Sequence, residues 1–363
     1  MSKASHSSEI ENINILSRKR LKAPVEYMRK HPSSPELIEH ITNSRQAIAR
    51  LLNRKDKRLM VILGPCSIHD YDLAIDYAQR LKKVADEVAK HIFIVMRVYF
   101  EKPRTIMGWR GLIIDPYLDG SNNMEEGLSL ARKILLDINK IGLPAATEVL
   151  DPIVPQFISD LISWAAIGAR TTESQIHREL ASGLSMPIGF KNSTDGSFIN
   201  SINGMETAFS SHTFLGVDEE GQLCLLDTKG NPNAHLILRG GNLGPNYDPE
   251  TIRETVLNLE SRGLPSSIIV DCSHANSDKD FSKQPDVFHN VVNQFIEGQR
   301  AIRGLMLESN INSGRQDFPS KLTDQEPKSL LKYGVSLTDG CIDWDCTENL
   351  IREAYNKMQR AGL

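Results

Sequence analysis

The chain has 363 residues, of which 40% are hydrophobic and 24% are charged, and its formal net charge is -4. This balance is typical of a globular protein, and the length fits either one large barrel or two ordinary domains. The chain has no excess of cations, and its pI is near 6.2, so clustered cations must serve a small local ligand rather than nucleic acid. No apolar run is long enough for a membrane span, so a membrane is not expected as a partner either.

The cysteines and the start of the sequence indicate a reducing compartment. Five cysteines, an odd number, are spread widely along the chain, which favours free thiols over a disulfide framework. The first twenty residues lack the apolar segment of a signal peptide. We therefore expect a cytoplasmic location.

The first part of the chain differs in character from the rest. Polar and proline-containing segments precede a helical stretch from Glu36 to Asn53. We interpret residues 1–55 as an N-terminal extension for regulation or oligomerisation, and residues 56–363 as a catalytic domain.

From Leu59 onward, short β-branched runs alternate with amphipathic helical segments. The eight runs are 59–63, 92–96, 145–147, 164–167, 187–190, 235–238, 267–270 and 304–307. This rhythm predicts the α/β class and a (β/α)8 TIM barrel. The interval between the fifth and sixth runs is too long for one helix, and two strand-like segments within it predict an inserted β-hairpin at about 211–228.

The carboxyl ends of barrel strands, where the functional site of a TIM barrel lies, carry most of the unusual side chains. Six cations are expected there: Arg97, Lys102, Arg104, Arg170, Lys191 and Arg239. They can be tolerated together only if they are paired or bind multiply charged anions. Because arginine binds phosphate and carboxylate bidentately, we expect organic phosphates, one of them also carrying a carboxylate. Gly240 and Gly241 would let the backbone approach such a group.

A second group combines a thiol, an imidazole and two carboxylates. Cys66, His274, Glu308 and Asp339 follow the first, seventh and eighth runs, which are neighbours in a closed barrel. Mixed sulfur, nitrogen and oxygen ligation suits one divalent ion of Mn, Fe, Co or Zn rather than Ca or Mg. His69 lies close enough to Cys66 in sequence to support this group.

Six blocks of the sequence resemble a known enzyme family. They are 64–70, 96–105, 168–175, 189–192, 238–241 and 271–274. From about residue 40 onward the chain is similar to the type I 3-deoxy-D-arabino-heptulosonate 7-phosphate (DAHP) synthases, the first enzymes of the shikimate pathway. The resemblance is to the class regulated by aromatic amino acids, and within it to the tyrosine-inhibited isoenzymes. It implies condensation of phosphoenolpyruvate with erythrose 4-phosphate and water, with release of phosphate and a metal acting as Lewis acid on the aldehyde.

The resemblance also implies roles for single residues. The phosphate of phosphoenolpyruvate would be bound by Arg170, Arg239, Glu148 and the backbone of Ala169. Its carboxylate would be bound by Arg97, Lys102 and Lys191, and the phosphate of the sugar by Arg104 and Thr105. The expected catalytic residues are Lys102, Arg97, Lys191 and His69, with Lys102 as the candidate proton donor and a metal-bound water as the alternative. The four metal ligands of the family match Cys66, His274, Glu308 and Asp339.

The resemblance further implies that an aromatic amino acid inhibits the enzyme. Its pocket would be formed by the hairpin, a helix of the barrel and the N-terminal arm of a neighbouring subunit, with Asn12, Pro155, Gln156, Ser185, Phe214 and Gly216 as matching positions. Tyrosine-inhibited relatives tend to have glycine, and phenylalanine-inhibited ones serine, at the position of Gly216. We therefore expect tyrosine, with phenylalanine as the alternative, and a homodimer or homotetramer.

Three other functions fit parts of the sequence. A synthase using a longer sugar phosphate, such as arabinose 5-phosphate, is opposed by the intact segment 102–105. An aldolase forming a Schiff base on Lys191 would be trapped by borohydride, whereas a metal enzyme would be inhibited by a chelator. A sensor of aromatic amino acids without catalysis would not need this full set of cations and ligands.

Overall fold

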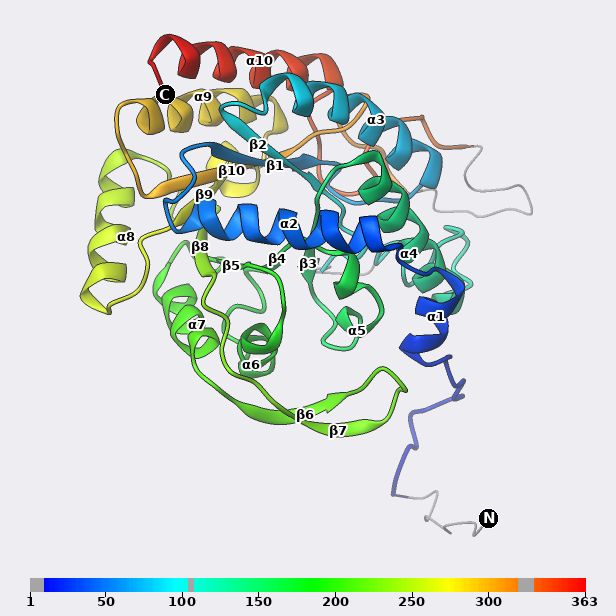
Figure 1. Ribbon diagram of the computed structural model, residues 1–363. Helices are drawn as coiled ribbons and strands as arrows, with labels where there is room; N and C mark the ends of the chain where they lie inside the picture. The colour runs from blue at the N-terminus through cyan, green and yellow to red at the C-terminus, as the bar shows by residue number, and fades with distance from the viewer. Residues whose placement is uncertain (1–9, 104–107, 319–329) are drawn as a thin grey trace.

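A closed barrel of eight parallel strands lies at the centre of the protein (Figure 1). The structure, a computed structural model, describes residues 10–103, 108–318 and 330–363. Around the barrel the strand order is β1 (Leu59–Gly64), β10 (Ile302–Glu308), β9 (Ile268–Asp271), β8 (Ala234–Leu238), β5 (Ile188–Lys191), β4 (Trp164–Ile167), β3 (Ala145–Val149) and β2 (Ile92–Arg97). Each predicted run overlaps one of these strands, so the predicted TIM barrel is confirmed.

The barrel strands are buried on both faces, which explains their continuous apolar runs. Inward side chains such as Met60, Ile62 and Val95 form one core cluster inside the barrel. Outward side chains such as Val61 and Ile94 join a larger cluster beneath the surrounding helices. Among the described residues, no helix combines the length and apolar character needed to cross a membrane.

Helices cover the outside of the barrel. They are α3 (Tyr71–Val88), α4 (Met124–Ile141), α5 (Pro155–Ile158), α6 (Gln175–Gly183), α7 (Ile199–Phe209), α8 (Pro249–Ser261), α9 (Gln284–Ile296) and α10 (Trp344–Arg360), with 3-10 turns η1 (Ser159–Leu161), η2 (His274–Ser277) and η3 (Phe281–Lys283). Side chains at their starts cap several of them, as Asp70 does by accepting a hydrogen bond from the backbone N–H of Leu73. Gly142 ends α4 with a φ of 93°, a left-handed conformation that favours glycine.

Two helices of the N-terminal segment precede the barrel. They are α1 (Pro24–Lys30) and α2 (Pro35–Leu52), and α2 crosses one end of the barrel (Figure 1). Its residues Ile48, Leu51 and Leu52 belong to the core cluster inside the barrel. The predicted domain boundary at residue 55 remains a prediction, but α2 packs as part of the barrel core.

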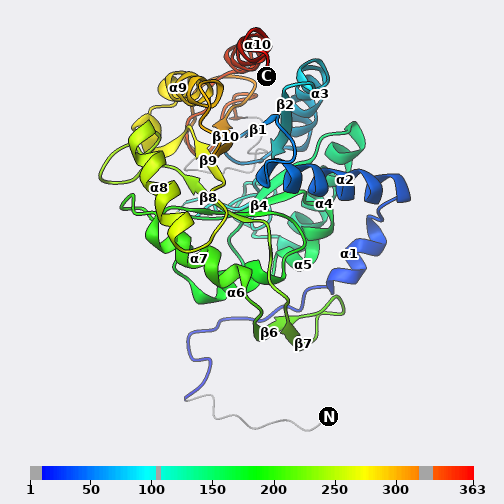
Figure 2. The same cartoon turned by 60° about the vertical axis from the view of Figure 1, so that its left-hand side comes forward.

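The predicted hairpin is present and projects from the barrel (Figure 2). It consists of β6 (Thr213–Val217) paired antiparallel with β7 (Leu223–Asp227). Its turn contacts the start of α1, where the backbone N–H of Val25 donates to the carbonyl oxygen of Glu219 at 2.9 Å.

Candidate active site

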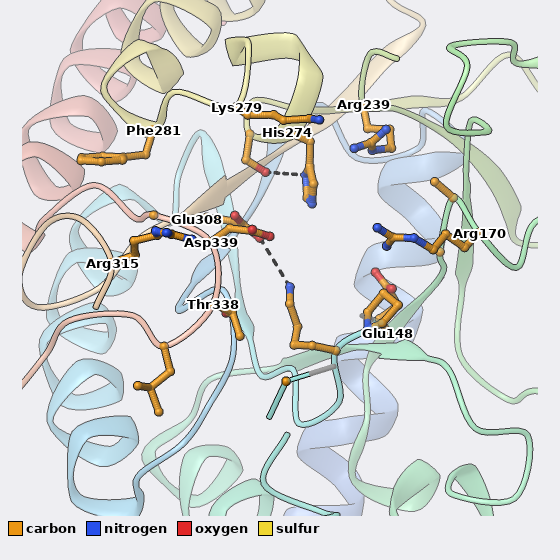
Figure 3. A pocket seen from close by; sticks show the side chains of 18 of the residues that line it. Glu148, Arg170, Arg239, His274, Lys279, Phe281, Glu308, Arg315, Thr338 and Asp339 are labelled. Carbon is orange, nitrogen blue, oxygen red and sulfur yellow. Dashed lines mark hydrogen bonds and ion pairs between the residues drawn. The ribbon is translucent and has the colours of Figure 1, made fainter. Parts of the chain in front are cut away.

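A cavity of about 850 Å³ opens among the loops that follow the barrel strands. Nine of the predicted site residues line it: Lys102, Glu148, Ala169, Arg170, Lys191, Arg239, His274, Glu308 and Asp339. Figure 3 labels six of them, from Glu148 and Arg170 to Asp339. Arg97 and Cys66 are fully buried and His69 is 4% exposed, and none of these three is among its lining residues. Arg104 and Thr105 lie outside the described residues.

Arg97, the last residue of β2, is a buried support for the carboxylate of Glu308. Its guanidinium donates to Glu308 Oε1 at 2.8 Å and to the carbonyl oxygen of Cys66 at 3.2 Å. It also lies 3.6 Å from the centre of the Tyr99 ring. Burial disfavours its charge, but the Glu308 carboxylate outweighs burial and raises the pKa of Arg97. The ion pair is therefore maintained and fixes the position of Glu308.

Lys102 extends from the loop after β2 toward the same carboxylate. Its ammonium donates to the carbonyl oxygen of Cys66 at 3.2 Å and lies 4.0 Å from Glu308 Oε1. Pro103 follows it, and the chain from 98 to 103 is neither helix nor strand, as the proline predicts. Burial opposes the charged form, but Cys66 and Glu308 raise the pKa of Lys102. The amine is therefore protonated at neutral pH and can act as a proton donor.

Glu148 and Lys191 form a second buried ion pair. The ammonium of Lys191, at the end of β5, lies 2.9 Å from Glu148 Oε2 and 3.8 Å from Asp271 Oδ2. Burial alone would raise the pKa of Glu148, but Lys191 and Lys102 outweigh it and lower this pKa to about 2. Gly168 makes room for the carboxylate, because a Cβ atom there would lie 2.7 Å from Glu148 Oε1.

Arg170 and Arg239 lie near this pair on the same side of the cavity (Figure 3). Burial lowers the pKa of Arg239, and the nearby positive charge of Arg170 acts in the same direction. Two neighbouring guanidinium groups with lysines close by form a region of strong positive potential that suits a dianion.

Three of the four predicted metal ligands come together. The Sγ of Cys66 and carboxylate oxygens of Glu308 and Asp339 all lie within 4.8 Å of one another. The hydroxyl of Thr338 donates to Cys66 Sγ at 2.9 Å. Burial, followed by the charge of Glu308, raises the pKa of the Cys66 thiol to about 11. A cation at this position would instead lower the pKa of the Cys66 thiol, because its positive charge would stabilise the thiolate and the two carboxylates.

His274 lines the same cavity but is not part of this close group. Its Nδ1 lies 3.0 Å from Asp271 Oδ2 and 2.7 Å from the hydroxyl of Ser273. The ring is therefore oriented by a buried carboxylate, a common arrangement for metal-binding histidines, and Nε2 is the nitrogen left to bind a metal. The donor set of one thiol, one imidazole and two carboxylates fits a divalent ion of borderline softness.

Several residues of the site were not singled out from the sequence. Tyr99 supports Arg97, Asp271 orients His274, and Lys279 and Arg315 add cations to the cavity lining. Asp271 could have been found, because it is a carboxylate at the end of a predicted strand. Arg315 could not, because it follows β10 in a long segment without helical or strand periodicity.

Gly240 and Gly241 also have a structural role, while their predicted role beside an anion stays a prediction. A Cβ atom on Gly241 would lie 2.1 Å from the backbone nitrogen of Gly196, and Gly240 has a φ of 71°. The pair allows two loops to pack closely, and this accounts for both glycines without a ligand.

The predicted inhibitor positions lie in four separate segments. Pro155 is buried at the start of α5, with Gln156 beside it, and Ser185 is exposed after α6. Phe214 and Gly216 lie two residues apart on β6, and Asn12 is in the exposed N-terminal arm. At Gly216, a Cβ atom would lie 2.2 Å from Leu226 Cδ1, so the space beside this glycine is filled by a flexible side chain.

The fold and the cavity define a class: a TIM-barrel protein with a cation-rich cavity beside a candidate metal site. Comparison with known proteins narrows the class. The DAHP synthetase I family matches residues 39–352. The Tyr-sensitive phospho-2-dehydro-3-deoxyheptonate aldolase of Escherichia coli (strain K12) is 50% identical over 96% of both chains. The Phe-sensitive aldolase of the same strain is 47% identical over 96% of this chain and 97% of its own.

A solved structure agrees with the sequence comparisons. The phospho-2-dehydro-3-deoxyheptonate aldolase of Francisella tularensis SCHU S4 superposes with a TM-score of 0.91 and 43% identity, covering 95% of this chain and 99% of its own. The chain therefore belongs to the DAHP synthetase I family and is an enzyme of the shikimate pathway, acting at its first step.

Proposed function

We propose that this enzyme condenses phosphoenolpyruvate with D-erythrose 4-phosphate and water to give DAHP and phosphate. The observation that carries the proposal is the meeting of Lys102, Arg170, Lys191 and Arg239 with Glu308 and Asp339 in one cavity. Cations for two phosphorylated substrates thus lie beside ligands for a metal ion.

The residues fit one divalent metal ion. Cys66, Glu308 and Asp339 would hold it, with His274 as the fourth ligand oriented by Asp271. When bound, the metal supplies Lewis-acid polarisation of the aldehyde of erythrose 4-phosphate. The buried Arg97 holds Glu308 in place for this role, and the sulfur ligand favours Mn, Fe, Co or Zn.

The cations of the cavity bind and orient phosphoenolpyruvate. Arg170 and Arg239, with Glu148 and the backbone of Ala169, would hold its phosphate, while Lys102 and Lys191 hold its carboxylate near Arg97. Fixing both ends of this small molecule presents its enol carbon to the aldehyde and lowers the entropic cost of reaction.

Lys102 would donate a proton during the reaction. Its ammonium donates to the carbonyl oxygen of Cys66 at 3.2 Å and lies 4.0 Å from Glu308 Oε1, so the proton that it would donate lies beside the candidate metal ligands. Lys102→Met should reduce turnover by at least about 100-fold, while titration of the purified protein with Mn²⁺ still shows one site per chain. Near-normal turnover of this variant would reject Lys102 as the donor.

The rival chemistry on Lys191 is disfavoured by its surroundings. Its ammonium is ion-paired with Glu148 at 2.9 Å, whereas a Schiff base requires the free amine. Removal of metal with EDTA should therefore abolish activity and Mn²⁺ should restore it, while borohydride with substrate should leave no adduct on Lys191.

We also propose that tyrosine inhibits the enzyme. The Tyr-sensitive relative is 50% identical and the Phe-sensitive one 47%, and Gly216 is the residue expected for tyrosine. Leu226 would have to rotate away from Gly216 for a phenol group to enter beside it. An assay with each aromatic amino acid should show inhibition by tyrosine at concentrations where phenylalanine has little effect; the reverse order would contradict this.

A further inference from the structure

Two cations that line the cavity have no role in the reaction proposed above. Arg315 lies in the segment after β10, and Lys279 lies in the loop after β9. Figure 3 shows Arg315 across Glu308 and Asp339 from Arg170 and Arg239. The cavity thus has cations on both sides of the candidate metal ligands.

The backbone around Arg315 is fixed relative to those ligands. Residues 314–316 run beside residues 336–341, with Arg315 paired to Ser336. Asp339 lies in the second of these segments. Backbone hydrogen bonds of 2.8 Å at both ends join the two segments. Arg315 is therefore held on the same local scaffold as a candidate metal ligand.

The two side chains are available for an anion. The guanidinium of Arg315 lies 3.6 Å from Asp317, and both side chains are largely exposed, so this ion pair is weak and easily exchanged. In the described part of the chain, no carboxylate lies within 4.0 Å of the Lys279 ammonium. Lys279 is held in a left-handed conformation (φ 61°) in which its backbone N–H donates to the carbonyl oxygen of His274.

Charge repulsion predicts which phosphate these cations bind. If Arg170 and Arg239 hold the phosphate of phosphoenolpyruvate, a second phosphate is repelled from that side of the cavity. The aldehyde end of erythrose 4-phosphate lies at the metal ligands, and its four-carbon chain can direct the phosphate away from phosphoenolpyruvate, toward Arg315.

We propose that Arg315 binds the phosphate of erythrose 4-phosphate and contributes to selection of this substrate. The proposal rests on the proposed function.

Steady-state kinetics with both substrates tests the proposal. Arg315→Ala should raise KM for erythrose 4-phosphate by about tenfold, while KM for phosphoenolpyruvate changes by less than about twofold. Arg315→Lys should lie between the wild type and the alanine variant, because lysine keeps the charge but not the bidentate geometry. Arg253→Ala, on the exposed surface of α8, is the matched control and should change neither KM.

Ionic strength gives a readout that a purely structural role would not affect. Added KCl should lower kcat/KM for erythrose 4-phosphate more in the wild type than in Arg315→Ala. An unchanged KM for erythrose 4-phosphate, or an equal rise in both KM values, would overturn the proposal while wild-type turnover keeps the proposed function intact. Absence of wild-type turnover of this substrate pair would instead reject the proposed function, and this proposal with it.

Discussion

Glu148 shows how the cavity sets the charge of a single residue. Its carboxyl group is buried beside Lys191, and its pKa is lowered from 4.5 to about 2. Because the folded state holds this carboxylate more strongly ionised than the unfolded chain does, the ion pair contributes stability above about pH 4.5. The contribution is lost as the pH falls from there toward 2. The pKa difference corresponds to about 3 kcal/mol.

The loss of stability on replacement of the Glu148 carboxylate should therefore depend on pH. We expect Glu148→Gln to lower the free energy of unfolding by about 3 kcal/mol at pH 7, because Lys191 loses its nearest counter-charge. The difference from the wild type should shrink as the pH falls below about 4.5. Urea unfolding of both proteins between pH 7 and pH 3 measures it. Glu254→Gln, at an exposed position of α8, is the control, and a pH-independent difference for Glu148→Gln would contradict the assigned cause.

At the scale of single residues, the sequence predicted which charged residues belong to the site better than it predicted what each side chain contacts. Nine predicted site residues line one cavity because the ends of barrel strands meet at one rim. Arg97, also at a strand end, is instead buried under Glu308. Its inward direction depends on the shear and tilt of the barrel, which a strand pattern alone does not specify.

At the scale of helices and strands, α2 has a packing role that the sequence pattern did not predict. The pattern predicted the helix, and the structure has it as Pro35–Leu52. What the helix covers is set by tertiary packing: Ile48, Leu51 and Leu52 join Met60 and other side chains of the barrel interior. Closure of this end of the barrel keeps water from the apolar layer that lies under the active site.

Truncation of an α2 side chain that packs into the barrel interior should lower the stability of the protein. Ile48 is 0% exposed and Ile38, on the same helix, is 55% exposed. We expect Ile48→Ala to lower the free energy of unfolding by about 2–5 kcal/mol, and Ile38→Ala to change it by less than about 0.5 kcal/mol. Equal effects of the two substitutions in urea unfolding would indicate that α2 does not close the core.

The eight strands and the inserted hairpin were predictable because each has a local signature of β-branched residues and turns. The segment after β10 has no such signature, although it carries Asp339 and Arg315. Its conformation depends on pairing between residues 314–316 and 336–341, which is a non-local property of the fold.

At the scale of the whole molecule, the exposed apolar side chains are concentrated in the N-terminal arm and the hairpin. Ile13 is 67% exposed and Leu16 fully exposed, while Leu215, Leu223 and Leu225 on the hairpin are 69–75% exposed. Exposed apolar groups of this kind mark interaction surfaces, and we propose that the partner is another copy of this chain. We propose that this assembly serves regulation.

Substitution in the arm should therefore separate catalysis from assembly and inhibition. We expect Ile13→Ser combined with Leu16→Ser to lower the mass measured by light scattering during size-exclusion chromatography, because the arm loses apolar area for its neighbour. Inhibition by tyrosine should weaken, since the arm with Asn12 is predicted to complete the inhibitor pocket of the adjacent subunit. The KM for phosphoenolpyruvate should stay within about twofold of wild type, because no described residue of the arm lines the cavity that contains Arg170 and Arg239. Leu257→Ser, at a position of α8 that is 61% exposed, controls for the loss of a surface leucine. An unchanged mass together with unchanged inhibition would show that the arm has neither role.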